Sequence, residues 1–258
     1  PGAFRIQSGE GEAGVKRLLG KALDNAISLG VVIIVLFLII PIRTELLDFL
    51  LIINIGLSIM ILMITMNISE TLEFSIFPSL LLVTTLFRLG LNVSSTRAIL
   101  SKGYAGEVIQ NFGNLITGGN IVVGVVIFLI IVLVQFIVIT KGAERVAEVA
   151  ARFTLDAMPG KQMAIDADLS SGLIDEQTAR LRRGKIQKEA DFYGAMDGAT
   201  KIVKGDAVMS LLITLINFVG GVIIGMVMGG GDFSTVLQKY SIVTIGDGLV
   251  SQLPALMI

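Results

Sequence analysis

Residues 121–140 have the sequence IVVGVVIFLIIVLVQFIVIT, a run that contains no charged side chain. An α-helix needs about 20 mostly apolar residues to cross the hydrocarbon core of a membrane, so this run is long enough to cross by itself. After a short basic run comes the charge-rich segment ARFTLDAMPGKQMAIDADL at residues 151–169. A membrane helix followed directly by a charged segment predicts that the chain leaves the membrane there and continues in water.

The composition favours a membrane protein over a soluble one. Of the 258 residues, 53% are hydrophobic and 16% are charged, whereas a soluble domain usually carries about 25% charged residues. The net charge of −1 argues against nucleic acid as a partner. The chain has no Cys and no His, which excludes disulfides, thiolate or zincin-type metal sites and serine–histidine catalysis. We expect a protein that is not an enzyme and holds no metal or organic cofactor.

Further apolar blocks predict an all-α integral membrane protein, a polytopic helical bundle. One block, at 74–96, is the weakest candidate for a span because it contains Pro78 and Arg88. The predicted spans are about 26–42, 46–66, 74–96, 117–140 and 207–229, with a sixth that starts near 242 and is still running at Ile258.

The distribution of basic residues predicts the orientation, because cytoplasmic loops carry an excess of Lys and Arg. The segment 141–206 carries eleven basic residues and the segment 1–25 carries four. Four predicted spans separate them, which places both in the cytoplasm. The predicted domains are a cytoplasmic segment 1–25, four transmembrane helices over 26–140, a cytoplasmic loop 141–206, and the fifth and the start of the sixth transmembrane helix over 207–258.

The loop 141–206 has a helical pattern of its own. Val146 and Phe153 recur at helical spacing, which predicts that the fourth span continues into the cytoplasm as an amphipathic helix. We expect Pro159 to end this helix. A second helix is predicted after Gly172, with acidic residues in its first turn. The loop is therefore predicted to be a helical hairpin that returns to the membrane, the alternative being a solvated connector.

Ionisable residues in or beside the spans are candidate functional residues, because charges at membrane depth are costly and tend to pair or to line pathways. Arg88 and Asp247, the latter flanked by Gly246 and Gly248, are hardest to explain as interfacial residues. They predict either a buried Arg–Asp pair that joins two helices or part of a proton or ion path. The other candidates can also be explained by a position at the membrane interface. The full set is Arg88, Arg97, Lys201, Asp206, Asp247 and Asp48.

Glycine spacing predicts close helix packing. Gly221, Gly225 and Gly229 recur every four residues, which makes a flat helix face where another backbone can approach closely. We expect Gly118, Gly119 and Gly124 to act in the same way in the fourth span. The alternative is the general enrichment of glycine in membrane helices.

Two Gly–Asp pairs leave a protease as an alternative. VKGDA at 203–207 and TIGDG at 244–248 resemble the GxGD motif of intramembrane aspartyl proteases, but Val203 and Thr244 replace its first glycine. Such chemistry would require Asp206 and Asp247 to meet in space.

Four stretches of the chain resemble the FHIPEP family, the export-gate membrane proteins of bacterial type III secretion. The resemblance covers nearly the whole chain from about residue 27 onward. The sequence VQFIVITKGAERVAEV at 134–149 is more similar to the flagellar branch of the family than to its virulence branch. The stretches are EFSIFPSLLLVTTLFRLGLNVSSTRAIL (73–100), residues 118–169, DFYGAMDGATKIVKGDA (191–207) and TIGDGLVSQLPAL (244–256).

The resemblance implies a ring of identical subunits, a nonamer, in the bacterial inner membrane. It implies other export-gate membrane proteins and membrane lipid as partners, and protons or sodium as the coupling ion for protein export. Exported substrates and chaperones are expected to bind only a large C-terminal domain outside this sequence. The family places importance on charges that match Arg88, Arg97, Lys201, Asp206 and Asp247. In the loop, the candidates for contact with neighbouring subunits are Arg145, Arg152, Asp156 and Lys161.

Two functions therefore compete. In the first, the chain belongs to an ion-conducting, energy-coupling gate in which Asp206 or Asp247 titrates. In the second, it is a structural ring that scaffolds the channel, and its membrane charges are fixed pairs.

Overall fold

The computed structural model describes residues 29–138, 142, 144–229 and 232–257. Within these ranges the chain is helical and contains no strand, which confirms the all-α fold class. Three helices are long and apolar enough to cross a membrane, or four if a bent pair of helices counts as one span. The protein is therefore a polytopic helical membrane protein.

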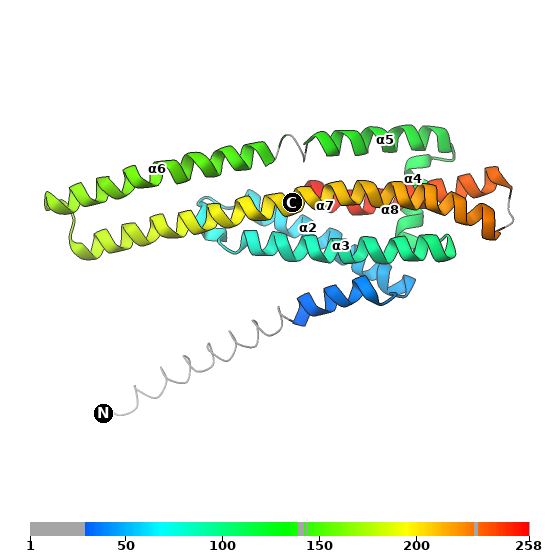
Figure 1. The fold of residues 1–258 in the computed structure, drawn as a ribbon, viewed down its shortest axis with the longest axis horizontal. Helices are drawn as coiled ribbons and strands as arrows, with labels where there is room; N and C mark the ends of the chain where they lie inside the picture. Colours follow the sequence, from blue (N-terminus) through cyan, green and yellow to red (C-terminus); the bar gives the residue numbers. More distant parts are fainter. Residues whose placement is uncertain (1–28, 139–141, 143, 230–231, 258) are drawn as a thin grey trace, which may run out of the picture.

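The helices form a bundle from which one long hairpin projects (Figure 1). In chain order they are a short apolar helix Leu29–Ile39, α2 (Thr44–Met66), the 3₁₀ helix η1 (Thr71–Phe74), α3 (Phe77–Lys102), α4 (Glu107–Thr117), α5 (Ile121–Ile137), α6 (Glu144–Ser170), α7 (Glu176–Gly229) and α8 (Phe233–Met257).

α3 forms although its sequence made it the weakest predicted span. Pro78 lies in the first turn of the helix, where the missing N–H group would have no intrahelical partner in any case. Arg88 is buried within the helix and is only 3% exposed. The helix therefore depends on how Arg88 is accommodated by its neighbours.

The predicted fourth span, 117–140, corresponds to α5, and a further helix, α4, precedes it. α4 and α5 are bent by 102° at the break between them. Gly118 and Gly119 have positive φ angles of 51° and 83°, a region that glycine adopts without the steric cost of a Cβ atom. These two residues turn the chain, so the prediction of a packing face was wrong for them. Gly124 does lie against another helix, because a Cβ atom there would be 2.6 Å from Thr117 of α4.

The charged loop is a helical hairpin, in which α6 packs antiparallel to the first half of α7 (Figure 1). Pro159 does not end the first helix as predicted, because α6 continues through it to Ser170. A proline in a helix interior costs about 3 kcal/mol. Met158 and Ile165 are buried in an apolar cluster with residues of α7, and burial of such side chains recovers a cost of this size.

α7 combines the charged second arm of the hairpin with the predicted fifth span in one helix of 54 residues. At a rise of 1.5 Å per residue, such a helix is about 80 Å long. Large apolar side chains are exposed along its second half, including Leu215, Ile223 and Val227. An exposed apolar surface of this kind is suited to lipid rather than water.

α8 occupies the centre of the bundle and contacts α2, α3, α4, α5 and α7. It begins at Phe233, nine residues before the predicted start near 242. Its buried residues include Ser241, Thr244, Asp247 and Gln252. A helix with this polar content is poorly suited to lipid, which explains why the other helices surround it.

The turn of the hairpin provides a test of the fold. Asp175 precedes α7 and its carboxylate accepts a hydrogen bond of 2.8 Å from the backbone N–H of Thr178. The bonds from Thr178 lower the pKa of Asp175. The capping hydrogen bonds are therefore fully stabilising above the ordinary aspartate pKa of about 3.9, where the carboxylate is ionised. This stabilisation is lost as pH falls through the lowered pKa.

We predict that Asp175→Ala accelerates hydrogen exchange in the first turn of α7 at neutral pH, because the N–H of Thr178 loses its acceptor. Asp175→Asn is the control, since an amide oxygen can still cap the helix. Equal exchange in wild type and Asp175→Ala would contradict the assignment of the cap.

Candidate functional site

A buried ion pair joins α3 to α7. The Nε group of Arg88 donates a hydrogen bond of 2.7 Å to Oδ2 of Asp206, and Nη2 contacts the same oxygen. Both side chains are 4% exposed. Each charge is costly away from water, and each is tolerated because the other is present.

The polar contacts continue one helical turn further along the same two helices. Asn92 lies four residues after Arg88, and Ser210 lies four residues after Asp206. The amide of Asn92 donates to Oγ of Ser210 over 3.3 Å. The hydroxyl of Ser251 donates to Oδ1 of Asn92 over 2.7 Å. Asn92 therefore connects α3 and α7 to α8.

Asp247 lies at the far end of this series of contacts. The amide of Asn217 on α7 donates a hydrogen bond of 2.8 Å to its carboxylate, and the hydroxyl of Ser95 on α3 lies against the same group. Asp247 is 3% exposed. Among the described residues, its hydrogen-bond partners are neutral side chains, in contrast to the arginine that holds Asp206.

The two glycines beside Asp247 explain how it becomes enclosed. A Cβ atom at Gly246 would collide with the backbone of Ile109 on α4, and one at Gly248 would lie 2.6 Å from the ring of Phe128 on α5. The absence of side chains at both positions lets α4 and α5 close against α8. The two glycines of the sequence GDG therefore allow the carboxylate of Asp247 to be buried inside the bundle.

We call this series of contacts the polar line. It comprises Arg88, Asn92 and Ser95 of α3, Asp206, Ser210 and Asn217 of α7, and Asp247 and Ser251 of α8.

Several polar atoms on or beside the polar line have no hydrogen-bond partner within the described protein. They include Oδ1 of Asp206, Oδ1 of Asn217, Oγ1 of Thr244 and Oε1 of Gln252. Buried polar atoms are normally hydrogen-bonded, so each of these oxygens is able to accept a proton donor that enters the bundle. The polar line thus has acceptor capacity that its own side chains do not use.

The other membrane candidates do not lie on the polar line. Asp48 accepts hydrogen bonds of 2.8 and 3.0 Å from the first backbone N–H groups of α4. Arg97 donates 2.8 Å to the carbonyl of Ile39 and so caps the short first helix. Lys201 forms an exposed ion pair of 2.7 Å with Asp197, one turn earlier on α7.

The loop candidates lie on α6. Arg145 and Arg152 both pair with Glu148, at 3.3 and 3.9 Å, and their side chains are 75% and 73% exposed. Asp156 is exposed. Lys161 differs from these three because its Nζ lies 2.9 Å from Glu189 on α7 and ties the hairpin together.

Two of the three predicted packing glycines lie against α8. The ring of Tyr240 packs over Gly221 and Gly225, where a Cβ atom at Gly225 would lie 2.6 Å from both Tyr240 and Val236. Gly229 is the last residue of α7, and its surroundings lie outside the described part of the chain. The close approach occurs between two helices of the same subunit.

The structure does not bring the two Gly–Asp pairs together. Asp206 lies beside Arg88, whereas Asp247 lies beside Asn217. On α7 these positions are separated by about 16 Å along the helix axis. An aspartyl protease needs two carboxylates about 3 Å apart, so the geometry removes the basis of the protease alternative.

Sequence reasoning found the charged ends of the polar line and missed its neutral members. Asn92, Ser95, Ser210, Asn217 and Ser251 are common residue types that carry no motif. A signal was nevertheless present, because Asn92 and Ser95 follow Arg88 at intervals of four and seven residues. This spacing places them on one face of α3.

Comparison with known proteins identifies the family. The FHIPEP family profile matches residues 34–258. The chain belongs to the FHIPEP family. No solved structure is significantly similar to it.

The curated relatives include proteins named for flagellar biosynthesis and proteins with other names. "Flagellar biosynthesis protein FlhA" of Bacillus subtilis is 58% identical over 91% of this chain and 35% of its own length. "Low calcium response locus protein D" of Yersinia pestis is 52% identical over 93% of this chain and 34% of its own length. FlhA of Salmonella typhimurium is 51% identical over 88% of this chain and 34% of its own length. The chain thus spans about a third of these relatives.

The ion pair gives a prediction for stability. Arg88→Ala leaves a carboxylate buried without its cation and should destabilise the folded protein by about 3–5 kcal/mol. Arg88→Met combined with Asp206→Leu removes both charges and should recover most of this loss. Thermal unfolding in detergent, followed by helical circular dichroism, measures both. A double variant no more stable than Arg88→Ala would show that the pair is not what stabilises this contact.

The glycine face gives a second prediction. Gly225→Ala places a methyl group in the space occupied by Tyr240 and Val236, and overpacking of this kind costs about 1–3 kcal/mol. Gly198→Ala on the same helix is the matched control, because a Cβ atom there meets nothing within 4 Å and alanine favours a helix. We expect only Gly225→Ala to lower the melting temperature, and equal melting temperatures would contradict the packing.

Proposed function

We propose that this chain is the membrane-embedded part of an export-gate component of a bacterial type III secretion system. Membership of the FHIPEP family supports this, because its relatives include flagellar biosynthesis proteins and a "Harpin secretion protein". We favour the flagellar branch, since the FlhA proteins of Bacillus subtilis and Caulobacter vibrioides are 58% and 57% identical.

In this proposal the protein is a multi-pass subunit of an inner-membrane ring, a nonamer, with its N-terminal segment and the α6–α7 hairpin in the cytoplasm. The eleven basic residues of 141–206 support the orientation. Arg145, Arg152 and Asp156, exposed on α6, are available to neighbouring subunits or to other export-gate membrane proteins. Substrates and chaperones act through regions outside this sequence.

The ring couples an ion motive force, carried by protons or sodium, to protein export. The observation that carries this proposal is the contrast between the two buried carboxylates. Asp206 is held by the guanidinium of Arg88, whereas Asp247 accepts a hydrogen bond from the amide of Asn217 and has the side chain of Ser95 beside it. A cation that reaches Asp247 neutralises a buried charge without having to displace an arginine. Asp247 is therefore the proposed ion carrier and Arg88–Asp206 the fixed pair.

α7 connects this site to the hairpin without a break. Asn217 and Asp206 belong to the same continuous helix as the hairpin residues that follow Glu176. A change in the charge of Asp247 alters the hydrogen bond to Asn217 and can therefore favour a different position of α7. A rigid helix carries that displacement to the charged hairpin, where contacts with neighbouring proteins can respond.

A structural ring without ion conduction is the second candidate. The Arg88–Asp206 pair favours it, since a fully paired buried charge is a means of holding helices together. In that case Asp247 only accepts a hydrogen bond from Asn217, and an asparagine could replace it.

Ion flux and export distinguish the two functions. We expect Asp247→Asn, introduced into the full-length protein in cells, to reduce export at least tenfold while the ring still assembles, and Asp247→Glu to retain part of the activity. Asp197→Asn is the matched control, because Asp197 lies on the surface of α7.

The same variants in liposomes should show flux driven by a proton or sodium gradient in wild type and none in Asp247→Asn. Normal export by an assembled Asp247→Asn ring would overturn the carrier role and support the scaffold.

A further inference from the structure

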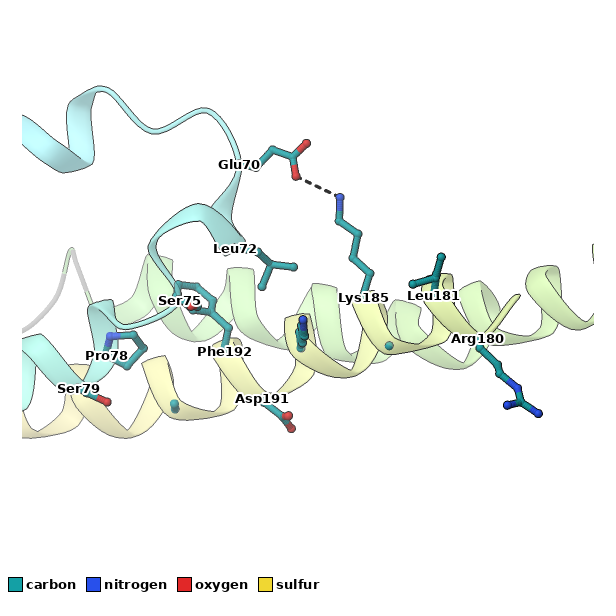
Figure 2. A pocket seen from close by; sticks show the side chains of 13 residues that line it. Glu70, Leu72, Ser75, Pro78, Ser79, Arg180, Leu181, Lys185, Asp191 and Phe192 are labelled. Carbon is teal, nitrogen blue, oxygen red and sulfur yellow. Dashed lines mark hydrogen bonds and ion pairs between the residues drawn. The ribbon is translucent and has the colours of Figure 1, made fainter. Parts of the chain in front are cut away.

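A second polar site lies outside the bundle, where the hairpin leaves it. A pocket of about 670 Å³ opens between the α2–α3 connection, the first turn of α3 and the hairpin half of α7. Figure 2 shows Glu70 and Leu72 facing α7 across this space, with Lys185 reaching back to Glu70. The pocket is separate from the polar line, and the proposed coupling does not use it.

One basic side chain of the pocket, Lys188, forms no ion pair with a described residue. Glu70 pairs with Lys185 at 3.1 Å, and Asp191 accepts a hydrogen bond of 2.9 Å from Gln187. Lys188 also lines the pocket, and no acidic partner faces it among the described residues. The remaining cation in the lining, Arg180, is paired with Glu176 at 2.7 Å. Lys188 is therefore the basic side chain of the lining that is available to an anion without breaking an ion pair.

The Lys185–Glu70 pair can give way to such an anion. Its side chains are 57% and 64% exposed, and exposed ion pairs of this type contribute little to stability. A phosphate oxygen placed between Lys185 and Lys188 gains charge-assisted hydrogen bonds from two ammonium groups. Lys185 is therefore able to exchange Glu70 for a ligand.

Apolar side chains also line the pocket, together with Ser75 and Ser79. Leu72, Pro78, Leu181 and Phe192 surround the cationic part of the pocket. A free inorganic anion makes no use of such walls. A molecule with a phosphate attached to glycerol and acyl chains uses both parts, because the esters and chains cover apolar surface while the phosphate meets the lysines.

The pocket lies beside the connection between two candidate membrane spans, α2 and α3. Arg88 and Asn92 of α3 contact Asp206 and Ser210 of α7 at a constant separation of 118 residues. The same register puts Pro78 close to the level of Ala195, and both line the pocket. Along α3, Pro78 lies about 15 Å from Arg88 in the direction of the hairpin. It is at the start of the membrane helix and beside the root of the charged hairpin.

We propose that this pocket binds the headgroup of an anionic phospholipid, with the phosphate between Lys185 and Lys188 and the glycerol and upper acyl chains against Leu72 and Phe192. Bound in this way, the lipid fixes the root of the hairpin to the membrane surface. Anionic lipids attract basic residues that lie next to a membrane helix.

Native mass spectrometry of the purified chain in detergent tests the site. The probes are phosphatidylglycerol, phosphatidylcholine with the same acyl chains, and inorganic phosphate. We expect phosphatidylglycerol to bind more tightly than phosphatidylcholine. Lys185→Gln combined with Lys188→Gln should weaken its first binding event by about tenfold. The matched control is Arg182→Gln with Arg183→Gln, which removes two charges that face Asp168 and Asp166 of α6 instead.

Glu70→Gln provides a test in the opposite direction. It releases Lys185 from its acidic partner and should tighten phosphatidylglycerol binding, a gain that misfolding cannot produce. Equal affinity for the two lipids, equal losses in the test and control double variants, or no gain in Glu70→Gln would each overturn the proposal. Complete displacement of the lipid by millimolar inorganic phosphate would show that the site takes a free anion instead.

Discussion

The ion pair between Arg88 and Asp206 is the constraint on which the rest of the bundle depends. Two opposite charges that are both 4% exposed can be tolerated only if they meet. Their contact sets the register of α3 against α7, and this register brings Asn92 opposite Ser210 one turn later. The depth of the hairpin root and the level of Asp247 both follow from the same alignment.

The central position of α8 is the second consequence of burying polar groups. A helix that carries Ser241, Thr244, Asp247 and Gln252 must be covered by protein rather than lipid. The close packing of α4 on α8 depends on glycines. Gly113 of α4 and Gly246 of α8 allow the backbones of the two helices to touch where they cross. The sharp turn at Gly118 and Gly119 then lets α5 close the opposite side. Local backbone geometry and burial of the carboxylate are thus two parts of one arrangement.

The proposed ion site and the proposed lipid site lie at two levels of the same long helix. Asp206 and Asn217 place α7 in the polar line, while Lys185 and Lys188 place its outer half beside the α2–α3 connection. A helix that is held at its root and contacts a titratable group deeper in the membrane can tilt about that root. This geometry gives the charged hairpin a physical reason to respond to ion occupancy.

The sequence by itself determined the helical membrane class, the hairpin and the charged ends of the polar line. Apolar run length, helical periodicity and the cost of a buried charge are local properties that a single chain displays. Only the tertiary structure decided that Arg88 pairs with Asp206 and that Asp247 is held by neutral groups. It also decided that Asp48 and Arg97 cap helix ends, and that α6 continues through Pro159. Each of these outcomes depends on which helix faces which, and packing free energy between distant segments sets that choice rather than any local pattern.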